Sequence, residues 1–142
     1  MRKKNFFSTI LSLLILIALI AVGYIFFKDM DGPSIAISPD TGRVSPHTSL
    51  QITLADPSNI RSISVGVRRN NVVTPIFQRH FEEYLPQRTV EVSLKNAGLR
   101  EGAFELEIKA TDASLAGFGQ GNTRTEVLAM RLDTQPPRIS VK

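Results

Sequence analysis

Residues 6–27, FFSTILSLLILIALIAVGYIFF, form an uncharged apolar run of 22 residues, and the rest of the chain is organised around it. As an α-helix, such a run extends about 33 Å, enough to cross a bilayer hydrocarbon core of about 30 Å. Basic residues at positions 2–4 precede it, and basic flanks stay on the cytoplasmic side of a membrane. We therefore expect residues 1–5 to be a cytoplasmic flank, residues 6–27 to span the lipid bilayer, and the chain from Lys28 onward to be exported.

Two interpretations of the apolar run are open. Ala21-Val22-Gly23 offers small residues where signal peptidase needs them, which is typical of a secretory signal peptide that is removed. However, residues 24–27 continue the run, which is longer than the usual apolar region of about 7–15 residues in a signal peptide. This length favours an uncleaved signal anchor that crosses a bacterial inner membrane once, with the bulk of the chain in the periplasm.

Charge and cysteine content exclude several functions of the exported part. Three of the 17 basic residues and none of the 13 acidic ones lie in the N-terminal flank, which leaves the rest with 14 basic residues and a net charge of +1. That balance gives no electrostatic footprint for nucleic acid, so we expect no nucleic-acid partner. The absence of cysteine excludes disulfides, thiolate metal ligands and thiol redox chemistry.

Short segments of alternating apolar and polar residues follow a polar spacer at residues 28–32. Period-two alternation is the signature of a β-strand that buries one face. It predicts strands at residues 35–37, 50–54, 62–68, 72–81, 90–94, 104–110 and 123–133, turns at 39–42, 56–59 and 70–71, and one helical turn at 95–101. About seven short strands in about 100 residues indicate an all-β fold, an immunoglobulin-like antiparallel β-sandwich over residues 33–134.

Individual positions in three of the predicted strands make sharper predictions about the sheet. Proline has no N–H to donate, so Pro75 places the strand at 72–81 at a sheet edge or at a bulge. In the strand at 104–110, the alternation places Leu106 in the core, and in the last strand it turns Leu128 and its alternate neighbours Met130 and Leu132 inward.

The start and the end of the exported part are similar to each other. Residues 31–37, DGPSIAI, align with residues 134–141, TQPPRISV, when Pro33 is placed on Pro137 at an offset of 104 residues. We therefore expect residues 135–142 to be the linker and first strand of a second module, and the chain to be the N-terminal piece of a longer protein. A frayed C-terminal tail is the alternative.

Residues 99–122, LREGAFELEIKATDASLAGFGQGN, resemble the pattern Leu-x-(Asp/Glu)-Gly-x-(Tyr/Phe)-x-Leu-x-hydrophobic-x-Ala-x-Asp, followed by Gly-Asn, of bacterial immunoglobulin-like modules. The loop at residues 114–120 is longer than that pattern has. The basic flank, the apolar helix, this module and residues 133–137, DTQPP, together resemble the non-catalytic N-terminal region of membrane-anchored lysostaphin-type zinc metallopeptidases, which are peptidoglycan endopeptidases. The resemblance implies an anchor and spacer that positions a downstream zinc peptidase domain next to peptidoglycan.

We expect no catalytic, cofactor-binding or metal-binding residue within this chain. A catalytic zinc needs about three protein ligands. The two histidines, His47 and His80, are 33 residues apart, and neither has a further ligand pattern nearby. Zinc is therefore expected only in the downstream domain, and we expect this segment by itself not to be an enzyme.

A contact surface is the weaker site hypothesis, and it supports an alternative function. Arg68 and Arg69 at the predicted hairpin, with Arg79 across it, form a basic patch that suits anionic headgroups or wall polymers such as peptidoglycan; solvated hairpin charges are the favoured interpretation. Phe118, in a glycine-rich loop, either packs on the module or is exposed as a contact. On this interpretation, an anchored periplasmic module binds a protein or polysaccharide through its hairpin and its long loop.

Four aspartates are candidate calcium ligands at a module junction. They are Asp29 and Asp31 in the spacer, with Asp112 and Asp133 further along. Calcium takes six or more oxygen ligands from a clustered set, and this spacing matches no known calcium-binding loop. Simple solvation of the spacer is the favoured interpretation, and calcium binding is the alternative.

Overall fold

The structure is a computed structural model that describes residues 3–40, 42–95 and 97–135. Its elements are α1 (Lys3–Phe27), β1 (Ser34–Ser38), β2 (Arg43–Val44), β3 (Ser49–Arg69), β4 (Val72–Ser93), β5 (Gly102–Asp112), α2 (Ala116–Gly119) and β6 (Thr123–Leu132). The prediction of a second module at residues 135–142, including the alignment of Pro33 with Pro137, lies almost wholly outside the described residues.

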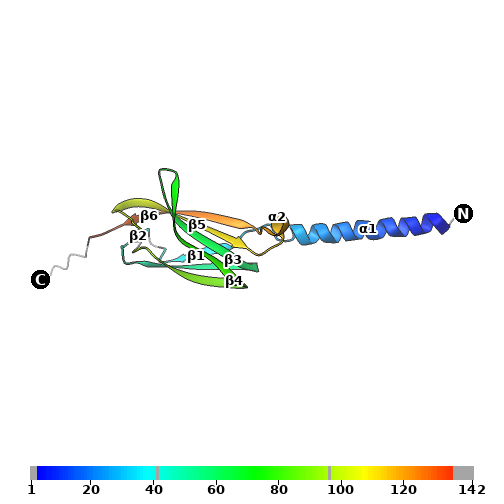
Figure 1. The fold of residues 1–142 in the computed structure, drawn as a ribbon, viewed down its shortest axis with the longest axis horizontal. Helices are drawn as coiled ribbons and strands as arrows, with labels where there is room; N and C mark the ends of the chain where they lie inside the picture. The colour runs from blue at the N-terminus through cyan, green and yellow to red at the C-terminus, as the bar shows by residue number, and fades with distance from the viewer. Residues whose placement is uncertain (1–2, 41, 96, 136–142) are drawn as a thin grey trace.

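The helix α1 projects away from the β-strands as a single straight rod (Figure 1). Its apolar stretch, Phe6–Phe27, contains no buried residue. A helix that is apolar all round is stable when protein or lipid surrounds it, and here no described part of the chain covers it. The sequence prediction is thus confirmed to this extent: the chain has one N-terminal helix that is long and apolar enough to cross a membrane.

The strands form one curled, mostly antiparallel sheet in the order β1-β3-β5-β6-β2, with β4 paired to β3. The long strand β3 is its centre. Residues 49–55 of β3 pair with β1 and with the second half of β4, whereas residues 60–69 pair with β5 and with the first half of β4. The sheet therefore changes partners halfway along β3, and its two halves enclose the core between them.

The change of partners occurs at residues 56–59. The sequence predicts a turn there that ends one strand and starts another, and this prediction is wrong, because β3 continues through the segment as an irregular bulge. Pro57 lacks an N–H, and Asn59 adopts a left-handed φ of +69°, which asparagine tolerates better than most residues. The turn chemistry bends the strand, while pairing with β4 on both sides of the bend keeps the strand continuous.

The buried side chains confirm the predicted alternation. Each strand turns one apolar face inward, and these faces meet in a single core whose largest fully buried side chains are Leu50, Ile52, Leu54, Ile60, Ile63, Val65, Val92, Leu94, Leu106, Ile108 and Leu132. In β6, Met130 is buried and Leu128 packs against the core, as predicted.

The predicted edge strand is also confirmed, and the predicted helical turn is wrong. Among the described strands β4 pairs with β3 alone, and the ladder shifts register where Pro75 lies opposite Gly66. The described part of residues 95–101 forms bends and a turn but no helix. The one short helix of the module, α2, lies instead in the glycine-rich loop between β5 and β6.

We expect the substitution Leu106→Asp to reduce the free energy of unfolding by at least about 3 kcal/mol, because Leu106 is fully buried and a carboxylate there has no partner. Chemical denaturation measures the loss. Ala103→Asp is the matched control, since Ala103 is exposed on the same strand. Equal stabilities of the two variants would show that the inward face of β5 is assigned wrongly.

Candidate functional site

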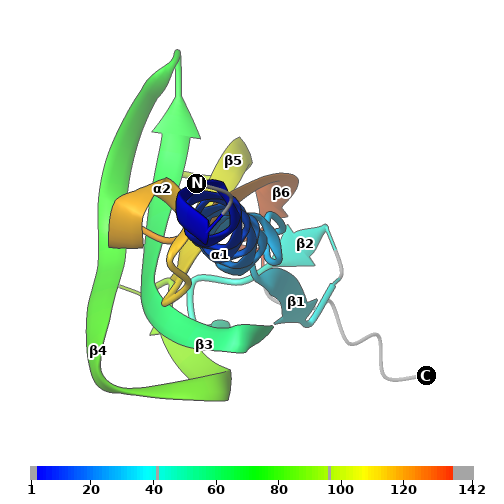
Figure 2. The same cartoon turned by 90° about the vertical axis from the view of Figure 1, so that its right-hand side faces the viewer.

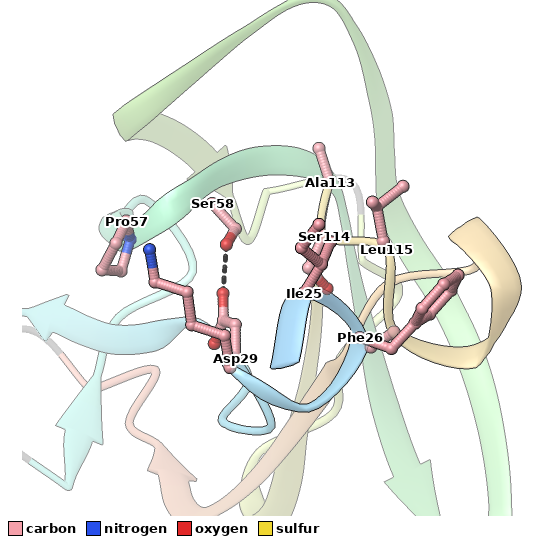
Figure 3. Close-up of a pocket in the computed structure, with 10 residues that line it drawn as sticks. Ile25, Phe26, Asp29, Pro57, Ser58, Ala113, Ser114 and Leu115 are labelled. Atoms are coloured by element: carbon pink, nitrogen blue, oxygen red, sulfur yellow. Dashed lines mark hydrogen bonds between the residues drawn. The ribbon is translucent and has the colours of Figure 1, made fainter. Parts of the chain in front are cut away.

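A cluster of polar side chains lies where α1 meets the module. We call it the junction cluster: Asp29, Asp31, Asp56, Ser58, Asp112, Ser114 and Asn122. Asp29 and Asp31 belong to the spacer between α1 and β1, Asp56 and Ser58 to the bulge of β3, and the other three to the end of β5 and the loop before β6. Figure 3 shows part of this region, with Asp29 and Ser58 facing each other beside the last turn of α1.

Asp112 is the buried centre of the junction cluster. Its side chain is fully buried, and its two carboxylate oxygens accept four hydrogen bonds. Oδ1 accepts from the backbone N–H and hydroxyl of Ser114 at 3.0 and 2.6 Å and from the backbone N–H of Asn122 at 2.7 Å, and Oδ2 accepts from the Asn122 side chain at 3.0 Å. A buried carboxylate is tolerated when it is hydrogen-bonded in this way.

The neighbouring Gly121 makes this arrangement sterically feasible. Its φ is +81°, and a Cβ atom at this position would lie 2.3 Å from the carbonyl oxygen of Asp112. The Gly121-Asn122 pair, which the sequence marks as a turn, therefore closes the loop directly on Asp112.

Asn122 and Ser58 attach the spacer to the module from two sides. The side-chain nitrogen of Asn122 donates to the carbonyl oxygens of Asp29 at 3.0 Å and of Asp31 at 3.3 Å. The hydroxyl of Ser58, from β3, donates to the carboxylate of Asp29. The residues that follow α1 are thus hydrogen-bonded to two different parts of the sheet.

Three carboxylates crowd together in the junction cluster. Oxygen atoms of Asp29, Asp56 and Asp112 all lie within 4.8 Å of one another. Burial raises the pKa of Asp56 above its ordinary value of 3.8, and the negative charges of Asp112, Asp29 and Asp31 raise it further, whereas the backbone N–H of Ser58, 2.7 Å from Oδ1, opposes the shift. The cluster is therefore under electrostatic repulsion at neutral pH.

The predicted set of calcium candidates is partly brought together. Asp29 and Asp112 meet, and Asp31 contributes its carbonyl to the same network. Asp133 does not, because it follows β6 at the other end of the module, where its backbone N–H donates to Val44. Sequence reasoning missed Asp56, which takes its place. Three carboxylates offer oxygen donors to a hard cation but fewer than the six or more ligands that calcium uses, and several of these oxygens already accept hydrogen bonds.

The predicted basic patch is divided into separate local contacts. Arg68 forms an ion pair with Glu107, and Arg69 donates to the carbonyl of Arg100 at 3.3 Å. Arg79 lies opposite Ile63, not across the hairpin from Arg68, and its guanidinium is 6.0 Å from the ring centroid of Phe81.

Phe118 lies far from these arginines. Its ring is 95% exposed, and its centroid is 5.8 Å from that of Phe26 in the last turn of α1. Along β5, the end next to its loop is seven residues from the strand position opposite Arg68, which corresponds to about 23 Å. The four predicted contact residues therefore do not form one surface.

The two histidines also lie apart. His47 is exposed in the turn before β3, and His80 is exposed on β4, with its ring centroid 6.3 Å from that of Tyr84. Within residues 3–40, 42–95 and 97–135, Asp29, Asp56 and Asp112 are the one group with the spacing of metal ligands, and neither histidine belongs to it.

Comparisons with protein families, with curated proteins and with solved structures give no match for this chain.

We expect Asp56→Asn to raise the melting temperature at neutral pH. The raised pKa means that the folded state binds a proton more tightly than the unfolded state, so the stability contributed by Asp56 falls as pH rises from about 3.8 through the folded pKa. The amide removes the charge and keeps an oxygen for the Ser58 N–H. Its advantage should be larger at neutral pH and shrink as pH falls to 3.8 and below, where Asp56 becomes protonated in both states.

Thermal unfolding of both proteins across this pH range tests the prediction, with Asp40→Asn as the control, because it removes the same charge from an exposed aspartate. A lower melting temperature for Asp56→Asn at neutral pH would contradict it, since the charged carboxylate would then be stabilising the fold.

Proposed function

We propose that this chain is a single-pass membrane anchor joined rigidly to an extramembrane β module, and that it holds the module at a fixed position beside the bilayer. The observation that carries this proposal is the attachment of the spacer. Asn122 binds two of its carbonyls, and Ser58 binds the side chain of Asp29. A flexible tether would leave these groups to water, whereas here they are bonded to the sheet.

The anchoring part of the proposal is supported by α1. No residue of its apolar stretch, Phe6–Phe27, is buried in the structure, and lipid is the environment that covers such a surface. The basic residues before it favour a cytoplasmic N-terminus, which would place the module in the periplasm of a bacterial cell.

We further propose that the module is an immunoglobulin-like β-sandwich. The change of partners along β3 supports this assignment, because it divides the curled sheet into two faces. One face consists of β1, the first half of β3 and the second half of β4; the other consists of the first half of β4, the second half of β3, β5, β6 and β2. Apolar side chains from both faces fill the space between them, and β2 pairs in parallel with β6 at the far edge.

What the module positions is proposed from resemblance alone. A downstream lysostaphin-type domain that holds zinc and cleaves peptidoglycan would need a support at a set distance from the membrane. The chain described here would supply that support and none of the zinc ligands.

The alternative, a module that binds a protein or polysaccharide through its hairpin and its long loop, is less well supported. The pairing of β3 with β5 separates residues 68–73 from residues 114–122 by most of the length of β5. One ligand surface that uses both segments is therefore disfavoured, and the positioning function is preferred.

The proposed topology can be tested by introducing cysteines into this cysteine-free chain. We expect a cysteine at Asn71, exposed at the hairpin, to react with a membrane-impermeant maleimide in right-side-out inner-membrane vesicles. A cysteine at Lys4, in the basic flank, should react in inverted vesicles alone. The reverse pattern would show that the module lies in the cytoplasm. If the labelled protein with cysteine at position 71 appeared in the soluble fraction, the helix would be cleaved and would not be an anchor.

A further inference from the structure

The loop between β5 and β6 presents apolar side chains that the module does not bury. Phe118 is the most exposed of the large apolar side chains in the described residues, at 95%, and Leu115 is 52% exposed. Residues 113–121, ASLAGFGQG, contain no charged residue. Exposing such a large apolar surface to water costs free energy, and contiguous exposed apolar surface typically marks a contact with a partner or a membrane.

The loop lies next to the end of the apolar helix. The helix α2 lies directly beside the module-proximal end of α1, and both views agree on this (Figures 1 and 2). The Phe118 ring is 5.8 Å from the ring of Phe26, which belongs to the apolar stretch that ends at Phe27. Ile25 and Phe26 also line one pocket together with Leu115, as Figure 3 shows. The apolar surface of α1 thus continues onto the loop.

The backbone of the loop is built to hold the ring outward. Phe118 has a φ of +59°, in the left-handed region that costs a non-glycine residue about 1–2 kcal/mol, and Gly117 and Gly119 on either side are also left-handed. The Arg61 guanidinium donates to the carbonyl oxygens of Gly119 at 2.8 Å and of Gln120 at 2.9 Å, which fixes the loop to β3. Neither core packing nor backbone preference accounts for this conformation of Phe118.

We propose that the tip of this loop, residues 115–118, inserts into the outer interfacial layer of the same bilayer that α1 crosses. This inference rests on the proposed anchor, and lipid is the chosen occupant because the loop is continuous with the apolar surface of the span. A lone helix, even when it is joined rigidly to its module, leaves helix and module free to tilt together in the bilayer. A second contact at Phe118 limits that tilt and holds the loop end of β5 against the membrane, with the hairpin near the other end of that strand.

The chain contains no tryptophan, so Phe118→Trp places a single tryptophan, which can be excited selectively over the two tyrosines, at the tip of the loop. The full chain is reconstituted in phosphatidylcholine–phosphatidylglycerol vesicles, with or without lipids brominated near the headgroup end of the acyl chain. We expect Trp emission at position 118 to be blue-shifted and to lose more than half of its intensity to the brominated lipids. Leu115→Trp is a second reporter and should behave in the same way.

Two further variants make the outcomes distinguishable. Leu16→Trp reports on the helix itself and is measured with lipids brominated near the methyl end of the acyl chain, because position 16 lies near the middle of the span. Val72→Trp reports on the exposed hairpin, where we expect red-shifted and unquenched emission. Unquenched emission from position 118 together with quenched emission from position 16 would overturn the loop insertion and leave the anchor intact. A blue shift at position 118 without quenching would have the same meaning, because the ring would then be packed on protein and not in lipid. Unquenched emission from position 16 would overturn the anchor and the loop insertion together.

Discussion

The buried carboxylate of Asp112 is the constraint on which the arrangement of helix and module depends. A charge without solvent is stable when its lone pairs are occupied, and here Ser114 and Asn122 occupy them with four hydrogen bonds. The need to satisfy Asp112 fixes the conformation of the loop that contains α2. It also orients the side chain of Asn122, which reaches the spacer after α1. One polar requirement inside the module thereby determines how the helix leaves it.

The junction cluster, where helix and module join, also contains repelling charges. Asp56 and Asp29 lie beside Asp112, so three carboxylates share a small and largely dry volume. Ser58 relieves part of the repulsion by donating its backbone N–H to Asp56 and its hydroxyl to Asp29. Burial, together with the remaining repulsion, raises the pKa of Asp56, so its contribution to stability falls as pH rises, whereas the apolar core of the sheet does not titrate. Stability and attachment are thus controlled by different kinds of interaction.

Local sequence patterns predict which faces of the strands turn inward, but they predict neither where β3 and β4 end nor how the helix joins the module. Alternation identified the inward faces of β3, β5 and β6, since a buried face repeats every second residue whatever its partner. Asp-Pro-Ser-Asn at residues 56–59 has the chemistry of a turn and so predicts the end of one strand and the start of another. Pairing with β4 on both sides overrides this local preference and keeps the strand continuous.

The junction cluster could not be predicted from the sequence, because tertiary pairing and not local pattern assembles it. Asp29, Asp56 and Asp112 are far apart in the chain, and pairing of β3 with β5 brings the last two together. The one usable signal was Asp112 followed by Gly121-Asn122, which pointed to a fold motif and not to a contact with the spacer.

The central claim is that helix and module move as one body, and a distance measurement between them tests it most directly. Cysteines at Val22 on α1 and at exposed Ala103 on β5 can carry nitroxide labels in the full chain reconstituted in vesicles. Pulsed electron–electron double resonance should give one narrow distribution of distances between the two labels. The distribution should broaden in Asn122→Ala and remain narrow in Thr89→Ala, which removes an exposed hydrogen bond to Thr53 elsewhere on the sheet. A broad distribution in the unaltered junction would contradict the account, because the spacer would then be a flexible tether.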